Sequence, residues 1–345
     1  MRHPLKIAAG LVTAVVGLAA LAGCGGPAAG DAAGGSGSLS LVAYSTPKEA
    51  YAELIPAFNK TPAGKGVKFT QSYGASGDQS RAVAAGLPAD IVALSLAPDI
   101  DKLVDPGIVD ANWAKNSAHN GFVTNSVVVL AVRKGNPKHI KGWDDLIRPG
   151  VEVVTPNPFS SGSAKWNILA AYGAQRRLGK TDAQATDYVK KLFQHVVSQD
   201  TSGANATNTF LSGKGDVLIT YESEAINARL NGRNIQYVIP RQTLLIELPI
   251  AVLKNSPNKD VANKFIQYVK GVPSQELFVQ YGFRPVNKTV AKEPTAVKEF
   301  PARPGIFRID DQILGGWRAA NKKWFEPNNG LMTKIEQGIG GPTAA

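Results

Sequence analysis

Apolar and polar positions along the chain follow two patterns, one with the period of a strand and one with the period of a helix. Short apolar runs predict strands at Ser40–Tyr44, Val67–Tyr73, Ile91–Leu94, Ser126–Arg133, Glu152–Thr155, Asp216–Tyr221, Ile235–Ile239 and Ile250–Lys254. Amphipathic patterns predict helices that include Pro47–Phe58, Gly162–Leu178, Asp182–Gln194 and Lys259–Val269. Because strands and helices alternate from Leu39 onward, we predict an α/β fold with largely parallel sheets.

Small polar residues stand where several predicted helices begin, just past a strand. They are Thr46-Pro47-Lys48-Glu49, Ser76-Gly77-Asp78-Gln79, Ser161-Gly162-Ser163 and the segment from Gly203 to Thr207. The first is typical of a capping box with proline at the first helical position, and the second follows the same capping logic. Free N–H groups and hydroxyls at the positive end of a helix dipole bind anions. One such start is usually only a cap, whereas four that converge would form a cradle of neutral donors.

Neutral donors have a consequence for specificity. A fully deprotonated oxyanion such as sulfate presents only acceptors, so N–H and hydroxyl donors can satisfy every oxygen. Hydrogen phosphate carries a proton, and a buried site without an acceptor would leave that proton unpaired, at a cost of about 1–3 kcal/mol. No carboxylate stands at a cap itself, but Asp78, Asp200 and Glu222 are close to these starts in the sequence. Any one of them turned toward the ligand would accept the proton of hydrogen phosphate.

Residues 1–23 are predicted to be a lipoprotein signal peptide. Arg2 and Lys6 precede an apolar run, Ile7 to Leu21, of secretory length and short for a membrane span. The stretch Leu21-Ala22-Gly23-Cys24 resembles the lipobox of bacterial lipoproteins, which implies that Cys24, the only cysteine, carries a lipid. Residues 24–38 are rich in Gly, Ala and Ser and are expected to form a tether. We therefore expect a protein at the outer face of the cytoplasmic membrane or in the periplasmic space, lipid-anchored at Cys24.

Composition sets the class of protein more broadly. The 345 residues are 43% hydrophobic and 19% charged, as in an ordinary globular protein of about two domains. The formal charge of +11 becomes +9 without Arg2 and Lys6. No basic block or basic helix stripe gathers this charge, so no nucleic acid partner is expected.

Enzyme motifs are weak in this sequence. Ser45-Thr46-Pro47-Lys48 matches the S-x-x-K of penicillin-binding enzymes, but S-D-N and K-T-G are absent. There is no G-x-S-x-G elbow, no P-loop and no G-x-G-x-x-G. The histidines at 3, 119, 139 and 195 lack metal-ligand spacing, so neither a metal nor a cofactor is expected. A cell-envelope hydrolase with a serine nucleophile stays open as the alternative to a non-enzymatic binding protein.

Several longer motifs are shared with a known family. They are Tyr44-Ser45-Thr46-Pro47-Lys48-Glu49, Gln71-Ser72-Tyr73-Gly74-Ala75-Ser76-Gly77, Val132-Arg133-Lys134-Gly135-Asn136-Pro137, Thr155-Pro156-Asn157-Pro158 with Ser160-Ser161-Gly162-Ser163, Thr207-Asn208-Thr209-Phe210, and Phe283-Arg284-Pro285. With these motifs the chain resembles the sulfate- and thiosulfate-binding proteins that feed bacterial ABC importers, over most of residues 40–290. The resemblance implies a two-lobed periplasmic-binding-protein-like fold of type II, which closes over a dehydrated anion in a cleft between the lobes.

The resemblance also implies which residues bind the anion. They are Ser45, Ser76, Ser161, Gly162, Ser163, Gly203 and Tyr221. Most would donate a backbone N–H, and Ser161 would add its hydroxyl. Tyr221 stands where the family commonly has a tryptophan, and a tyrosine hydroxyl can accept a proton as well as donate one. Ser45 replaces an aspartate, Asp78 replaces a usual lysine, and Lys165, close to Ser163 in the sequence, is a further candidate.

The function that the resemblance implies is capture of sulfate and its delivery to an ABC importer. Thiosulfate, molybdate and phosphate are the alternative ligands.

The predicted lobe 1 comprises residues 39–124 and 248–345, and lobe 2 comprises 125–247, with crossings near Thr124–Asn125 and Glu247–Leu248. The expected partners are the permease subunits, the expected state is a monomer, and contact with the membrane would be through the lipid anchor alone.

Overall fold

The computed structural model describes residues 37–344. The predicted signal peptide, Cys24 and most of the predicted tether therefore lie outside the described residues. Within residues 37–344, no helix combines the length and the apolar character that crossing a membrane would require.

One mixed sheet runs through the fold in the order β2-β1-β3-β9-β4-β7-β5-β6, with β8 and β10 paired to β4 and β11 paired to β9. Its strands are β1 Ser38–Tyr44, β2 Lys68–Gly74, β3 Ile91–Ala93, β4 Phe122–Arg133, β5 Val153–Pro156, β6 Val196–Asp200, β7 Val217–Tyr221, β8 Ile235–Val238, β9 Thr243–Val252, β10 Arg284–Pro285 and β11 Ile306–Phe307. Two groups of strands are parallel internally. We call β2, β1 and β3 the first half-sheet and β7, β5 and β6 the second half-sheet.

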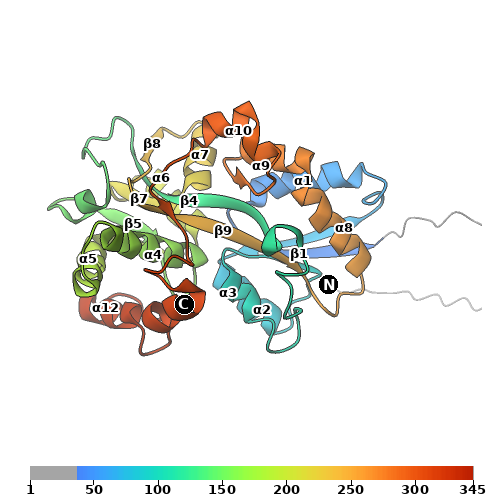
Figure 1. The fold of residues 1–345 in the computed structure, drawn as a ribbon, viewed down its shortest axis with the longest axis horizontal. Coiled ribbons are helices and arrows are strands. Elements are labelled where there is room, and N and C mark those ends of the chain that lie inside the picture. Colours follow the sequence, from blue (N-terminus) through green and yellow to red (C-terminus); the bar gives the residue numbers. More distant parts are fainter. Residues whose placement is uncertain (1–36, 345) are drawn as a thin grey trace, which may run out of the picture. The chain divides into compact units, whose positions relative to one another are not determined.

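The long strands β4 and β9 join the two half-sheets (Figure 1). They are antiparallel to each other, with Asn125 opposite Glu247. β9 pairs with β3 at its carboxyl end, and β4 pairs with β7 at its own. The α/β class and the mixed, largely parallel sheets predicted from the sequence are thus confirmed.

The helices cover both faces of this sheet. They are α1 Lys48–Asn59, α2 Ser76–Ala84, α3 Ala97–Asp101, α4 Gly162–Arg177, α5 Asp182–Gln194, α6 Gly203–Leu211, α7 Glu222–Leu230, α8 Lys259–Lys270, α9 Val272–Gln280, α10 Pro294–Glu299, α11 Gly316–Ala320 and α12 Leu331–Ile339. Short 3₁₀ turns lie at Ala118–Gly121, Trp143–Ile147 and Val290–Lys292, and a π-helical turn lies at Asn321–Phe325. The largest buried apolar cluster draws side chains from both half-sheets and from these helices.

The predicted bounds differ from the structure mainly at the crossing strands. β9 begins at Thr243, seven residues before the predicted start at Ile250, because Glu247 and Pro249 interrupt the apolar pattern of a strand that is nevertheless buried. β6 was not predicted, since its sequence VVSQD is short and only half-buried. The predicted helices Asp182–Gln194 and Gly162–Leu178 agree with α5 and α4 to within one residue.

The C-terminal segment packs beside the second half-sheet. Helix α12 contacts α5, and Gln199 Nε2 on β6 donates to Glu336 Oε2 on α12 at 3.1 Å. The rings of Trp324 and Tyr172 meet edge to face, with centroids 5.0 Å apart. The lobe bounds expected from the sequence stay predictions.

Candidate functional site

A small cavity lies where three helices begin, between the two half-sheets. Its lining is uncharged and consists of Tyr44, Ser45, Thr46, Gly74, Ala75, Ser76, Ser95, Ser161, Gly162, Ser163, Ser202 and Gly203. Six of the seven residues expected from the resemblance are among them. The cavity volume is about 10 Å³, far below the roughly 300–1,000 Å³ of sites for drug-sized ligands. The cavity therefore suits a ligand of a few atoms.

The start of α4 forms one wall. Its entry loop is held by the backbone of Asn157, which donates to Asp200 O at 2.7 Å and accepts from Ser161 N at 2.9 Å. Ser161 is the N-cap residue of α4, but its side chain accepts no capping hydrogen bond. Because the first N–H groups of a helix have no partner within it, those of Gly162 and Ser163 are left facing the cavity.

Gly162 is required at this position by close packing. A Cβ at Gly162 would lie 2.7 Å from Leu96 Cδ2 and 2.8 Å from Ser95 Oγ. Any side chain would therefore push α4 away from the loop that follows β3, and the N–H groups of the two sides would no longer converge.

The start of α2 forms the opposite wall, and its serine hydroxyl is already used. Ser76 Oγ donates to Asp99 Oδ2 at 2.7 Å and accepts from Ser95 N at 2.9 Å. Asp99 is buried and also pairs with Lys102 at 3.0 Å. The Ser76 N–H, at the first position of α2, has no acceptor among the hydrogen bonds of the described residues. The Ser76 N–H is therefore the polar group of this residue that remains for the cavity.

Ser45 and Gly203 complete the set of backbone donors. The Ser45 hydroxyl donates to Gly74 O at 2.9 Å, so its N–H is the group left for a ligand. Gly203 is the first residue of α6 and packs on Ser163, with a hypothetical Cβ 3.1 Å from Ser163 Oγ. α6 does have a side-chain cap, because Ser202 Oγ accepts from Asn205 N at 3.1 Å.

The capping predicted at α1 and α2 was wrong. The N-cap residues are Pro47 and Ala75, and neither makes a side-chain capping bond. The reason at α1 is that Glu49 turns away from the helix start and accepts from Asn227 Nδ2 at 2.9 Å on α7. The starts of α1 and α2 therefore have fewer backbone N–H groups with a side-chain acceptor than the sequence pattern predicts. N–H groups without an acceptor favour the binding of an anion.

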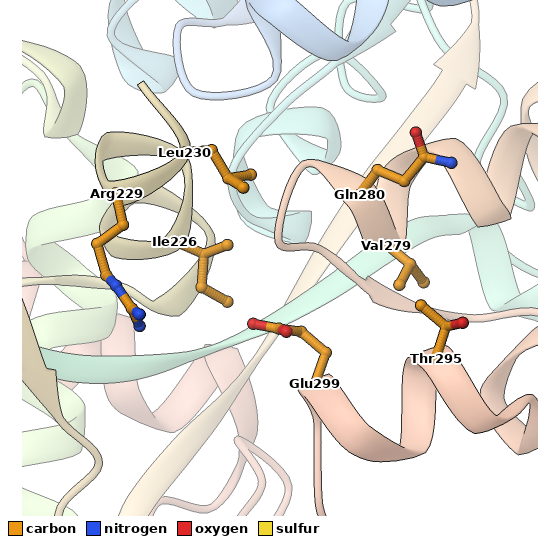
Figure 2. A pocket seen from close by; sticks show the side chains of 7 residues that line it. All are labelled: Ile226, Arg229, Leu230, Val279, Gln280, Thr295 and Glu299. Atoms are coloured by element: carbon orange, nitrogen blue, oxygen red, sulfur yellow. The ribbon is translucent and has the colours of Figure 1, made fainter. Parts of the chain in front are cut away.

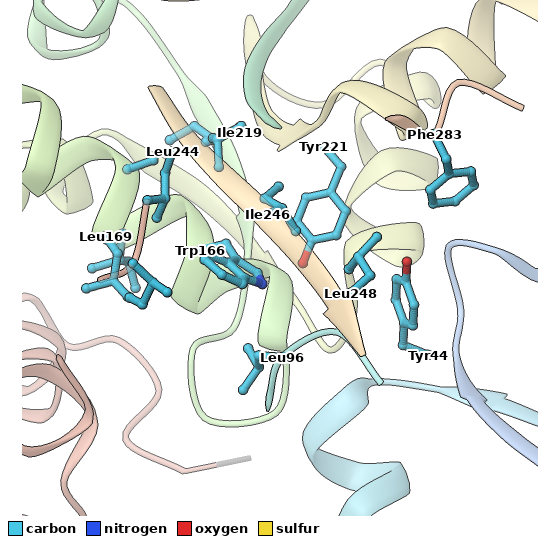
Figure 3. Packing of buried hydrophobic residues seen from close by; sticks show 14 of the residues in the cluster. Tyr44, Leu96, Trp166, Leu169, Ile219, Tyr221, Leu244, Ile246, Leu248 and Phe283 are labelled. Atoms are coloured by element: carbon cyan, nitrogen blue, oxygen red, sulfur yellow. The ribbon is translucent and has the colours of Figure 1, made fainter. Parts of the chain in front are cut away.

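Tyr221, the seventh expected residue, lies one step behind the cavity wall. Its hydroxyl is 2.5 Å from Ser95 Oγ, and Ser95 O accepts from Trp166 Nε1 at 2.8 Å. Figure 3 shows the indole nitrogen of Trp166 and the hydroxyl of Tyr221 on facing sides of two adjacent rings, above Leu96. Burial raises the pKa of Tyr221, and hydrogen bonds to Ser95 and Ser163 lower it less, so the phenol stays protonated.

The carboxylates that could accept a proton from a ligand lie outside the cavity. Asp78 pairs with Arg81 on the exposed side of α2. Asp200 accepts from Thr209 Oγ1 at 2.8 Å, and Glu222 accepts from Arg284 Nε at 2.7 Å. None of the three acids lines the cavity.

Sequence reasoning missed two residues. Ser95 follows β3 without any capping pattern, so only the fold brings it to the cavity. Glu224, on α7, lines a wider groove that shares Ser45 and Thr46 with the cavity. Burial raises the pKa of Glu224, and the hydroxyls of Thr46 and Thr207 lower it, while its Oε1 has no hydrogen-bond partner in the described part of the chain.

Lys165 does not line the cavity. Its Nζ lies 5.1 Å from the ring centroid of Phe325, and burial lowers its pKa to about 8. Among residues 37–344 there is also no group of three His, Cys, Asp or Glu side chains placed to hold a metal ion.

A second groove, shown in Figure 2, is less suited to an anion. It lies between α7 and the helices α9 and α10, and Ile226, Leu230 and Val279 form its apolar part. Arg229 and Glu299 bring opposite charges to it. Only one helix start, that of α10 at Thr295, reaches this lining, so we place the candidate site in the smaller cavity, where three helix starts meet.

Comparisons with known proteins identify the family of the chain. Residues 39–284 match the family described as bacterial extracellular solute-binding protein. The chain is 37% identical to a sulfate-binding protein of Synechococcus elongatus over 99% of this chain and 98% of that one, and 35% identical to a thiosulfate-binding protein of Pseudomonas aeruginosa over 87% and 92%. The solved structure of the sulfate-binding protein SubI from Mycobacterium tuberculosis has a TM-score of 0.80 and 45% identity, covering 84% of this chain and 99% of that one.

Proposed function

The chain belongs to the bacterial extracellular solute-binding proteins, and from this premise we propose that it captures sulfate in the cavity and delivers it to an ABC importer. The observation that carries the proposal is the convergence of uncapped helix starts on a small uncharged space. Relatives named for sulfate and for thiosulfate support a sulfur oxyanion as the ligand, with sulfate first and thiosulfate second.

The proposed contacts follow from which polar groups are free. Five residues offer a backbone N–H to the cavity: Ser45, Ser76, Gly162, Ser163 and Gly203. Those at the starts of α2, α4 and α6 lie at the positive ends of helix dipoles, which favour an anion. The Ser161 hydroxyl adds a donor that makes no other hydrogen bond in the described residues. Tyr221 acts on the anion through Ser95, whose Oγ lies 2.5 Å from the phenol oxygen. Fixed neutral donors of this kind stabilise a dianion by hydrogen bonding alone.

We infer that ligand capture is a closure of two lobes. The supporting contacts join the two half-sheets directly: Gly77 N donates to Ser160 O at 3.1 Å, and Trp166 Nε1 donates to Ser95 O. The proposed lobes keep the predicted crossings at 124–125 and 247–248, where β4 and β9 pair. The contact of α12 with α5 supports assigning the segment after Pro301 to the second lobe instead of the first.

We infer binding without turnover. The family is one of solute-binding proteins, and the Ser45 hydroxyl of the S-x-x-K match is engaged by Gly74 O. A serine-directed probe that acylated the protein would support the hydrolase alternative and count against this inference.

The proposed location is outside the cytoplasmic membrane, as for the extracellular family. Attachment through a lipid on Cys24, a monomeric state and docking to permease subunits are parts of the same proposal, supported by the sequence pattern Leu21-Ala22-Gly23-Cys24 and by the named relatives. Mass spectrometry of membrane-extracted protein tests for the lipid on Cys24. The added mass of the lipid should be present in the wild type and absent from a Cys24→Ser variant.

Calorimetric titration of ligand-free protein tests the ligand. We expect sulfate to bind with a defined stoichiometry of one, thiosulfate to compete for the same site, and molybdate to bind more weakly because closure over a larger ion is less complete. Absence of heat with both sulfate and thiosulfate would overturn the proposed function.

A further inference from the structure

A polar groove lies beside the cavity and continues it. Ser45 and Thr46 line both spaces. The dipeptides Tyr73-Gly74 and Gly203-Ala204 also pass from one space to the other, since one residue of each lines the cavity and its neighbour lines the groove. The groove has a volume of about 600 Å³, within the roughly 300–1,000 Å³ of sites for drug-sized ligands. A substituent on a ligand held in the cavity would therefore extend into this groove.

Two buried polar atoms of the groove lining lack a hydrogen-bond partner in the described part of the chain. They are Oε1 of Glu224 on α7 and Oγ1 of Thr207 on α6, in residues that are 9% and 6% exposed. Burial raises the pKa of Glu224 and the nearby hydroxyls of Thr46 and Thr207 lower it, but neither hydroxyl completes a hydrogen bond to Oε1. Because a buried polar atom without a partner costs free energy, a ligand group that paired with these two atoms would be favoured.

The charges that line the groove balance. Lys48 and Arg233 are exposed cations, and Glu49 and Glu224 are the two carboxylates. Glu49 is already engaged by α7, because its Oε2 accepts from Asn227 Nδ2 at 2.9 Å. A fully charged substituent of either sign would meet a like charge in this lining. Uncharged hydroxyl groups, which both donate and accept, match its mixture of donors and acceptors.

Deepening the proposed function, on which this inference rests, we propose that the groove is a subsite for the hydroxylated substituent of a sulfate monoester, such as a sugar sulfate. The three free oxygens of the ester occupy the cavity as those of sulfate do, and the fourth oxygen carries the substituent past Thr46 into the groove. One hydroxyl of the substituent donates to Glu224 Oε1, and Thr207 Oγ1 donates to an oxygen of the substituent. Glu224 and Thr207 are then specificity-determining residues for the ester, and sulfate itself does not reach them.

The test compares two esters that share the sulfate group. Glucose 6-sulfate carries hydroxyl groups and methyl sulfate carries none, whereas both have a single negative charge. Kd values for both esters and for sulfate are measured on ligand-free full-length protein by calorimetry and by competition. We expect glucose 6-sulfate to compete with sulfate and to bind at least about tenfold more tightly than methyl sulfate, since it adds a hydrogen bond to a carboxylate. Sulfate, with two charges, should bind more tightly than either ester.

Two variants and two matched controls locate the effect in the groove. Glu224→Gln removes the charge of the acceptor, and Thr207→Val removes the hydroxyl at nearly constant shape. Each should raise the Kd for glucose 6-sulfate about tenfold and leave the Kd values for sulfate and methyl sulfate unchanged. Glu336→Gln and Thr220→Val alter buried side chains that also have an unpaired oxygen in the described residues but line neither the groove nor the cavity, so neither should change any Kd.

The outcomes separate this inference from the proposed function. Glucose 6-sulfate that failed to compete with sulfate, or that bound less than tenfold more tightly than methyl sulfate, would overturn the inference, while sulfate binding upheld the proposed function. Wild-type affinity for glucose 6-sulfate in both Glu224→Gln and Thr207→Val would have the same meaning. Failure of sulfate to bind would overturn both.

Discussion

The backbone N–H of Gly77 donates to the carbonyl oxygen of Ser160 across 3.1 Å, and so ties the first turn of α2 to the loop that leads into α4. Both residues lie next to proposed ligand contacts, Ser76 on one side and Ser161 on the other. The bond therefore fixes how far apart two walls of the cavity are.

Gly77→Ala should weaken sulfate binding about tenfold. The new Cβ would lie 2.7 Å from Ser160 O, which is backbone and cannot rotate away, so the two walls must separate. Calorimetry gives the affinity, and Gly338→Ala, at a helical position with nothing within 4 Å, is the matched control. An unchanged affinity would show that closure does not depend on this contact.

Ser161→Ala should weaken sulfate binding by about 1.5–3 kcal/mol, the value of a hydrogen bond to a charged group. The backbone donors of α4 remain, so the loss should be confined to one bond. Ser212→Ala, an exposed serine on the same half of the fold, serves as control. Wild-type affinity in Ser161→Ala would place the anion elsewhere.

Arg284→Met should destabilise the protein by about 3–5 kcal/mol, because it leaves the Glu222 carboxylate buried without its partner. Burial raises the pKa of Glu222 and Arg284 lowers it, so the variant should have a still higher pKa at Glu222. A carboxyl group whose pKa is higher in the folded than in the unfolded state binds its proton more tightly in the folded state, so the free energy of unfolding rises as pH falls. The Tm of the variant should therefore lie less far below that of the wild type at pH 5 than at pH 8. The double variant Glu222→Gln/Arg284→Met should recover most of the loss; equal deficits at the two pH values would contradict this account.

Glu336→Gln should stabilise the protein at pH 8 and have little effect at pH 5. Burial raises the pKa of Glu336 to about 7, above the unfolded value near 4.5, so the folded state holds the extra proton between these values and loses stability as pH rises through them. The gain at pH 8 should be about 1–3 kcal/mol. Thermal unfolding at both pH values measures it, with the exposed Glu276→Gln as control. A gain of equal size at pH 5 would show that the carboxyl proton is not involved.

The sequence was sufficient for much of the cavity, because local patterns mark helix starts. Ser161, Gly162 and Ser163 stand together in one such start, and the structure brings them to Ser45, Ser76 and Gly203. Ser95 could not be found in this way, since nothing local distinguishes it and its partner Tyr221 is 126 positions away. Sequence patterns also implied side-chain caps on α1 and α2, but the fold gives Glu49 and Ser76 different partners.

The absence of any charged side chain from the cavity lining bears on the medium in which the protein works. Mobile ions screen fixed surface charges over a Debye length of about 8 Å at physiological ionic strength. Hydrogen bonds from N–H groups act at contact distance, inside a space that excludes those ions. A receptor built in this way should retain its affinity for the ligand at high salt concentration, where a site lined by lysine or arginine would lose affinity.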